Sequence, residues 1–115
     1  MYFLINYQPY IAIIGDIKGS KAIKNRKEVQ ENLAMVLNEI NDHYSDDIAS
    51  RFMITLGDEF QGLLLNGTSV MKIISRIEGR LDPVKLRFGI GVGEITTKIN
   101  PYMAIGADGP GYHKA

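Results

Sequence analysis

Residues 51–65 read RFMITLGDEFQGLLL, two largely apolar runs that meet at Gly57-Asp58. Each run is short and rich in residues that favour β-strands. A two-residue type II′ turn needs glycine at its first central position, so this stretch predicts a β-hairpin with Gly57 and Asp58 at its tip. The alternative for Asp58 is a plain turn residue, because aspartate favours turns through local hydrogen bonds.

The residues before the hairpin predict one strand and one helix. Residues 10–17, YIAIIGDI, form a continuous apolar run, which is typical of a central strand covered on both faces. From Val29 to Tyr44, apolar residues recur every three or four positions and form the stripe of an amphipathic helix. Asn25 and Glu28 resemble a capping box, which predicts that this helix begins just after Asn25.

The residues after the hairpin predict a second helix and a last strand. Residues 70–81 carry another apolar stripe at helical spacing, and Asp82-Pro83 ends it. In residues 84–95, VKLRFGIGVGEI, apolar side chains alternate with charged residues and glycines, as in a strand with one apolar face. The three alternate glycines either make room for a helix or let a ligand approach the backbone.

The predicted order of elements is β-α-β-β-α-β, an α+β, ferredoxin-like arrangement with helices on one face of an antiparallel sheet. A length of 115 residues suits one domain, so we assign residues 1–115 to a single domain. We also expect a short strand at residues 102–105. The chain stops within what resembles the start of a helix at residues 111–115, so we expect an N-terminal fragment of a longer protein.

The composition excludes several classes of protein. The chain has 13 basic and 13 acidic residues, so no overall charge indicates a nucleic-acid partner. It has no cysteine, which excludes disulfides and thiolate metal sites and fits a reducing compartment. No apolar run reaches membrane-spanning length, so we expect a soluble, cytoplasmic protein without a membrane partner.

The predicted topology brings two distant carboxylates to one end of the sheet. The first and third strands of this arrangement are antiparallel neighbours, so Asp16 at the end of one lies near Asp58 at the start of the other. Two close carboxylates repel each other unless a cation lies between them. Mg²⁺ or Mn²⁺ suits such a pair, because magnesium takes one or two carboxylates and fills its other positions with water and phosphate oxygens.

The loop that follows the first strand predicts a phosphate site beside these acids. Gly19 and Ser20 offer backbone N–H groups at a strand-to-helix turn, and Lys18 and Lys21 add positive charge. Taken alone, a lysine-rich loop is usually solvated surface. Glu59 follows Asp58 directly and should point to the opposite face of the sheet, so we assign it at most a supporting role.

Four blocks of the sequence resemble the SatD family of bacterial proteins. These blocks are YIAIIGDIKGSK, ITLGDEFQGLL, RFGIGVGEI and AIGADGPGYHKA, and together they cover roughly residues 10–115. The biochemical activity of that family is not established. Its members are typically longer than this chain, which agrees with the expectation of a fragment.

The same blocks resemble, more distantly, the catalytic domain of class III nucleotidyl cyclases. That resemblance implies a cyclase-like fold in which Asp16 and Asp58 hold the metal, with the Ile17 carbonyl as a further ligand. It also implies that Gly19 and Ser20 form the turn that faces the phosphates.

The sequence departs from the cyclases at two places. The next cyclase helix carries an Asn and, four residues later, an Arg, whereas this chain has Pro110 with Lys114 or Gly111 with Ala115. Loss of such donors typically lowers the rate of reaction by about 100- to 1,000-fold each. The LGDEF stretch also differs from the GGDEF signature of diguanylate cyclases, because Leu56 replaces a glycine needed for close approach of the nucleotide.

Two functions follow as hypotheses. The first is binding of a nucleotide or another phosphorylated ligand with a divalent cation at a cyclase-like site, with phosphoryl-transfer activity left open. The second is a non-catalytic regulatory or ligand-sensing module that acts through a missing C-terminal region able to bind DNA or a partner. In both cases we expect a homodimer, because cyclase-like domains commonly pair to form their sites.

Overall fold

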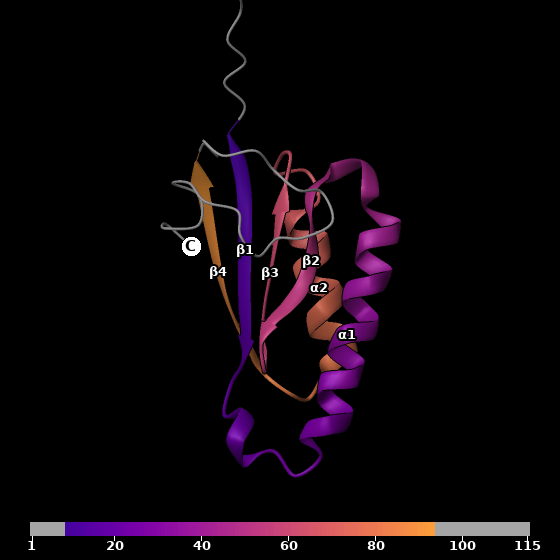
Figure 1. Cartoon of the computed structure of the whole chain (residues 1–115), viewed down its shortest axis with the longest axis vertical. Helices are drawn as coiled ribbons and strands as arrows, with labels where there is room; N and C mark the ends of the chain where they lie inside the picture. Colours follow the sequence, from indigo (N-terminus) through magenta and orange to yellow (C-terminus); the bar gives the residue numbers. More distant parts are fainter. Residues whose placement is uncertain (1–8, 94–115) are drawn as a thin grey trace, which may run out of the picture.

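The structure is a computed structural model, and it describes residues 9–93, with the backbone alone at Lys21 (Figure 1). The elements in this part of the chain are β1 (Tyr10–Ile17), η1 (Ser20–Ala22), α1 (Arg26–His43), η2 (Ser45–Asp47), β2 (Ile48–Leu56), β3 (Glu59–Leu64), α2 (Val70–Leu81) and β4 (Leu86–Gly93). The predicted order β-α-β-β-α-β is therefore confirmed. The expected strand at residues 102–105 and the helix start at residues 111–115 lie outside the described residues.

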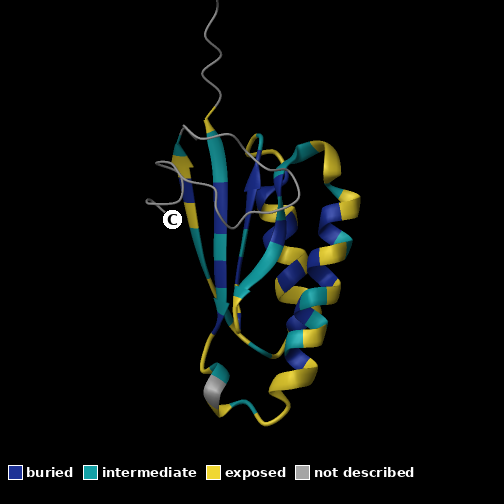
Figure 2. Ribbon diagram, viewed as in Figure 1, coloured by how far each residue is buried: buried dark blue, intermediate teal, exposed yellow. Residues whose placement is uncertain are grey.

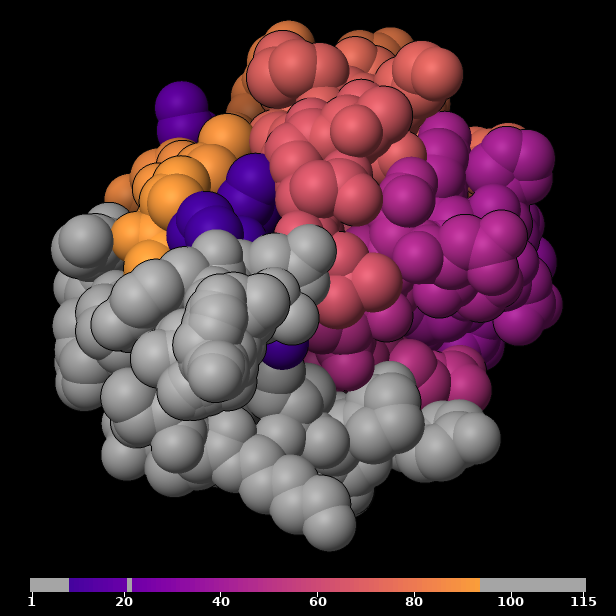
Figure 3. All heavy atoms as spheres, turned by 90° about the horizontal axis from the view of Figure 1, so that it is seen from above, coloured from indigo at the N-terminus to yellow at the C-terminus, as the bar shows by residue number. Residues whose placement is uncertain are grey.

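The four strands within residues 9–93 form one sheet in the order β2-β3-β1-β4. Every neighbouring pair is antiparallel. This order confirms the ferredoxin-like fold, in which the first and third strands occupy the centre of the sheet. Figure 3, the view from above, shows β4 beside β1 and the region around the end of α1 on the other side of the molecule.

Both α-helices of the described region cover the same face of the sheet and form a second layer (Figure 1). The apolar stripes predicted for the two helices point into the core between the layers, and Figure 2 shows their buried positions facing the sheet. The buried core is formed by Ile13, Ile17, Val29, Leu33, Val36, Leu37, Ile40, Phe52, Phe60, Leu64, Val70, Ile73, Ile74, Ile77 and Leu81.

A glycine in the centre of β1 makes room for an aromatic ring. Gly15 pairs with Phe60 on β3 and with Phe88 on β4. A Cβ atom at Gly15 would lie only 2.4 Å from Cζ of Phe60, so the ring occupies the space that a side chain would need. The rings of Phe60 and Phe88 pack edge to face at 5.9 Å between centroids, and they join the three strands over Gly15.

The β2–β3 connection is the predicted two-residue turn. Gly57 has a φ of 60°, and Asp58 has no positive φ, as the type II′ pattern requires. Glycine adopts this conformation without the steric cost that a side chain would bring. The turn places Asp58 at the same end of the sheet as the end of β1.

The ends of the helices agree with the sequence except in one respect. Asn25 stands at the N-cap of α1, but its side chain makes no capping hydrogen bond, so the predicted capping box is wrong. α2 ends at Leu81, just before Asp82-Pro83, as predicted. Neither α1 nor α2, the helices of the described region, has the length and apolar character needed to cross a membrane.

Candidate functional site

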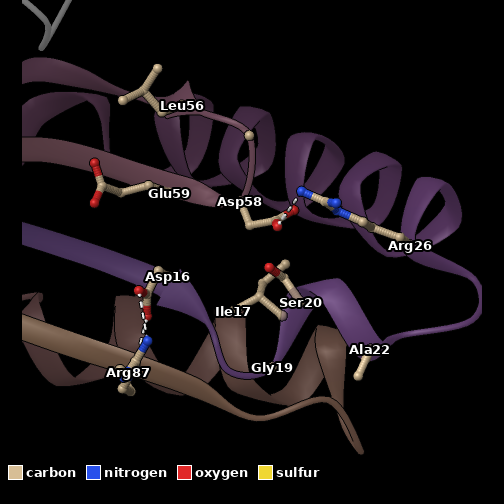
Figure 4. Close-up of a pocket in the computed structure, with 11 residues that line it drawn as sticks. Asp16, Ile17, Gly19, Ser20, Ala22, Arg26, Leu56, Asp58, Glu59 and Arg87 are labelled. Atoms are coloured by element: carbon tan, nitrogen blue, oxygen red, sulfur yellow. Dashed lines mark hydrogen bonds and ion pairs between the residues drawn. The ribbon is translucent and has the colours of Figure 1, made fainter.

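A cavity of about 560 Å³ opens where β1 ends and the β2–β3 turn begins (Figure 4). Four distant parts of the sequence form its wall, because β1 lies between β3 and β4 and the start of α1 passes over the turn. Its lining residues are Asp16, Ile17, Gly19, Ser20, Ala22, Arg26, Leu56, Gly57, Asp58, Glu59 and Arg87.

Asp58 is buried, with 8% of its surface exposed, and it is held by side chains of α1. Nη2 of Arg26 donates to Oδ2 of Asp58 at 3.0 Å, and Nε2 of Gln30 donates to Oδ1 at 2.6 Å. Burial by itself would raise the pKa of the Asp58 carboxyl. Hydrogen bonds from Ser20, Gln30 and Arg26 outweigh this effect, and the positive charge of Arg26 adds to them, so the pKa lies below its ordinary value of 3.8. Asp58 is therefore a fixed anion at neutral pH.

Asp16 is held by an arginine from the neighbouring strand. It pairs in register with Arg87 on β4. Nε and Nη2 of Arg87 donate to Oδ1 and Oδ2 of Asp16, both at 3.1 Å, so the contact is bidentate. Because Ile13 and Ile17 point into the core, strand alternation places Asp16 on the face away from the helices. This contact is open to solvent, since the side chains of Arg87 and Asp16 are 65% and 37% exposed.

Glu59 is closer to the site than the sequence predicted. It pairs in register with Asp16, so the two acids are cross-strand neighbours on one face of the sheet. The Thr55 hydroxyl lies 3.3 Å from Oε1 of Glu59 and donates to it. The sequence placed Glu59 correctly on the face opposite Asp58, but the register of β3 against β1 was needed to see that Asp16 shares that face.

The structure brings Asp16 and Asp58 to one cavity, and it turns their carboxylates in different directions. Asp58 faces α1, whereas Asp16 faces Arg87 on the other side of the sheet (Figure 4). The predicted location at one end of the sheet is therefore observed. Each acid has its own arginine partner in this structure.

The loop after β1 contributes Gly19 and Ser20 to the cavity wall. Gly19 has a φ of 61° and precedes η1, and the Ser20 side chain helps to lower the pKa of the Asp58 carboxyl. Ile17 is buried and also lines the cavity. Lys18 lines a different cavity, together with Glu78 and Asp82, so the structure does not bring it to the site. Of Lys21, only the position of its backbone in η1 is described.

Sequence reasoning missed the two arginines of the cavity. Arg26 stands one residue after the N-cap of α1, and Arg87 stands on the polar face of β4. A prediction for Arg87 was within reach, because the pairing of the first and last strands places it directly opposite Asp16. The position of Arg26 depends on how α1 packs over the hairpin, for which the local sequence carries no signal.

The donor atoms at the cavity suit a hard divalent cation. Its lining residues include three with carboxylate side chains and one serine, and Mg²⁺ needs as few as one or two carboxylates when water and phosphate oxygens complete its coordination. Within residues 9–93, no group of three or more His, Cys, Asp or Glu side chains could enclose a metal ion. The carboxylates of the cavity wall are those of Asp16, Asp58 and Glu59.

Comparison with solved structures found a likeness to the crystal structure of the guanylyl cyclase Cya2. The two chains share 16% sequence identity, with a TM-score of 0.43. The match covers 90% of this chain and 64% of the cyclase chain, so this chain spans less than two thirds of its length. The ferredoxin-like fold rests on the strand order described above.

Comparison with curated proteins found no match. Comparison with protein-family models found one that covers nearly the whole chain. Residues 10–115 match the model described as the SatD family. The chain therefore belongs to the SatD family.

Proposed function

We propose that this protein binds a nucleotide together with Mg²⁺ or Mn²⁺ in the cavity at the end of β1. The observation that carries the proposal is the charge on the described cavity wall. Asp16, Asp58 and Glu59 supply three negative charges, whereas Arg26 and Arg87 supply two positive charges. The net negative charge of this wall repels a phosphate group that carries no cation. A bound divalent cation makes the net charge positive, so the wall then attracts the phosphate.

Asp16 and Asp58 are the residues that would hold the cation, with the Ile17 carbonyl as a further oxygen donor. The lowered pKa keeps Asp58 ionised, so it needs no deprotonation before it accepts a cation. When bound, the cation neutralises charge on the phosphate oxygens. Gly19 and Ser20 stand at the same wall and offer a backbone N–H group and a hydroxyl to the phosphates.

Leu56 supports a nucleotide over a simple phosphate as the ligand. Its side chain is 77% exposed and lines the cavity beside the charged residues. A nucleotide has an aromatic base with apolar faces in addition to its phosphates, so a site with both kinds of surface suits it. We expect ATP or GTP to bind more tightly than inorganic pyrophosphate.

The test is calorimetric titration of ATP and GTP, with Mn²⁺ present, into the wild-type protein, Asp16→Asn and Asp58→Asn. We expect each substitution to weaken binding by about tenfold or more, because it removes a full charge from the cation site. Glu39→Gln is the matched control, since Glu39 pairs with Arg80 outside the cavity. Unchanged binding in both aspartate variants would contradict the proposed site.

The second candidate is a ligand-sensing module without catalysis, acting through a C-terminal region that binds DNA or a partner. The observation that favours it is the pairing of each aspartate with an arginine, which balances the acids without a cation. Product analysis of the same titrated samples separates the two functions. A new nucleotide product indicates an enzyme, and binding with the nucleotide recovered intact indicates a sensor.

A further inference from the structure

We propose that Arg26 and Arg87 are exchangeable counter-ions, which hold Asp58 and Asp16 when the site is empty and turn to the phosphates when a cation binds. This inference rests on the proposed function and assigns it two ligand-binding residues that the sequence did not identify. It also explains how binding of the cation and binding of the phosphate strengthen each other.

The first step in the argument is that both arginines share the cavity with the acids they hold. Arg26 and Arg87 line the same wall as Asp16 and Asp58. The side chain of Arg87 is 65% exposed and that of Arg26 is 45% exposed, so each guanidinium has solvent-accessible space to move into. A change of side-chain rotamer is enough to redirect them, and the strands and helix need not move.

The second step is that the ion pair between Arg87 and Asp16 is open enough to solvent for a cation to reach it and exchange. Ion pairs open to solvent contribute little, because water screens them and two long side chains lose freedom. The contact between Arg87 and Asp16 is such a pair. A divalent cation carries twice the charge of a guanidinium and competes for the same carboxylate oxygens, so it replaces the arginine as the partner of Asp16.

The third step concerns Asp58, which is buried and needs partners of its own. When Arg26 leaves, Nε2 of Gln30 still donates a hydrogen bond to Oδ1 of Asp58. The departure of Arg26 therefore does not leave the buried carboxylate of Asp58 without a hydrogen-bond partner. A buried charge without partners would destabilise the fold. This arrangement allows Arg26 to exchange while Asp58 keeps its position.

The fourth step is the chemistry of the released side chains. A guanidinium presents N–H donors in a planar fork that matches two oxygens of a phosphate. Arg87 already makes a two-point contact of this kind with a carboxylate. Each arginine that leaves its acid thus favours phosphate binding, and bound phosphate in turn favours the cation by the same factor.

The experiment measures the affinity for Mn²⁺ alone and the affinity for pyrophosphate in the presence of Mn²⁺. The proposed exchange predicts that the loss of an arginine changes these two affinities in opposite directions. Mn²⁺ alone, and then pyrophosphate in the presence of Mn²⁺, are titrated by calorimetry into the wild-type protein, Arg87→Ala, Arg26→Ala and Arg80→Ala. Arg80 is the matched control, because it pairs with Glu39 away from the cavity. Circular dichroism confirms that each variant is folded.

We expect Arg87→Ala to bind Mn²⁺ alone about two- to fivefold more tightly than wild type, since a competing cation has gone. We expect the same variant to bind pyrophosphate with Mn²⁺ about tenfold more weakly, since a phosphate ligand has gone. Arg26→Ala should change both affinities in the same directions. Arg87→Lys should restore part of the competition with Mn²⁺ and little of the pyrophosphate affinity, because lysine keeps the charge and lacks the fork.

The outcomes separate this inference from the function on which it rests. If Mn²⁺ and pyrophosphate bind wild type and both arginine variants equally, the exchange is overturned and the metal–phosphate site stands. If both affinities fall together in Arg87→Ala, the arginine only supports the structure of the site, and the exchange is again overturned. If neither wild type nor any variant binds pyrophosphate in the presence of Mn²⁺, the proposed function fails and the exchange fails with it.

Discussion

Asp58 is a buried carboxylate whose surroundings favour its charged form. Burial would raise the pKa of this group, but hydrogen bonds from Ser20, Gln30 and Arg26 lower it below the ordinary value of 3.8. A group whose pKa is lower in the folded state than in the unfolded state stabilises the fold when it is ionised. That contribution is fully present above the unfolded pKa, and it is lost as the pH falls through the folded pKa.

A pH series of unfolding experiments tests this property of Asp58. We expect the free energy of unfolding of wild type to fall as the pH drops from about 5 to about 2, and to fall less in Asp58→Asn, which cannot titrate. Urea denaturation followed by circular dichroism at each pH gives both curves. Parallel curves over that range would show that Asp58 does not contribute to acid sensitivity.

At the scale of single residues, the sequence identified Asp16 and Asp58 and gave Glu59 a lesser place. The aspartates were recognisable because each stands next to a local signal, the end of an apolar run or a glycine turn. Glu59 on β3 and Arg87 on β4 are the cross-strand neighbours of Asp16 on β1. Cross-strand neighbours depend on the register of the strands. Register is harder to predict from a single sequence than the order of the secondary-structure elements.

Among the secondary-structure elements, β2 is irregular and depends on a side chain of α1. Its register against β3 shifts between Ser50 and Met53. There the buried Asn41 side chain bonds to the backbone of Phe52, accepting from its N–H at 2.7 Å and donating to its C=O at 2.9 Å. The side-chain amide of Asn41 thus provides hydrogen-bond partners for both the N–H and the C=O of Phe52, which is not among the residues of β2 paired with β3.

Substitution of Asn41 tests this link between α1 and β2. We expect Asn41→Ala to lower the free energy of unfolding by about 2–4 kcal/mol, because it leaves a buried N–H and a buried C=O without partners. Asn38→Ala is the matched control, since Asn38 is exposed on the same helix and should change stability by less than about 0.5 kcal/mol. Equal effects of the two substitutions would contradict the role assigned to Asn41.

For the whole molecule, the sheet has two different edges in the described residues. The β2 edge carries register shifts, which make a strand a poor template for pairing. The β4 edge is regular against β1 and carries two exposed apolar residues, Ile90 at 45% and Val92 at 48%. An exposed, regular edge with apolar side chains favours association, so the β4 side is where we expect the proposed homodimer to form.

Light scattering coupled to size-exclusion chromatography tests the dimer. We expect twice the mass of the chain for wild type and a shift toward the monomer for Val92→Lys, because a charge at the interface opposes association. Met35→Lys is the control, since Met35 is 55% exposed on α1. A wild-type protein that stays monomeric at every concentration tested would contradict both the dimer and a site shared between protomers.

The central claim is that nucleotide binding at the end of β1 requires a divalent cation. The most direct measurement is calorimetric titration of ATP and GTP into the wild-type protein, once with Mn²⁺ and once with EDTA. The negative excess of charge on the described cavity wall predicts binding with Mn²⁺ and a loss of at least about tenfold in affinity with EDTA. Equal binding of the nucleotide under both conditions, or no binding under either, would contradict the claim.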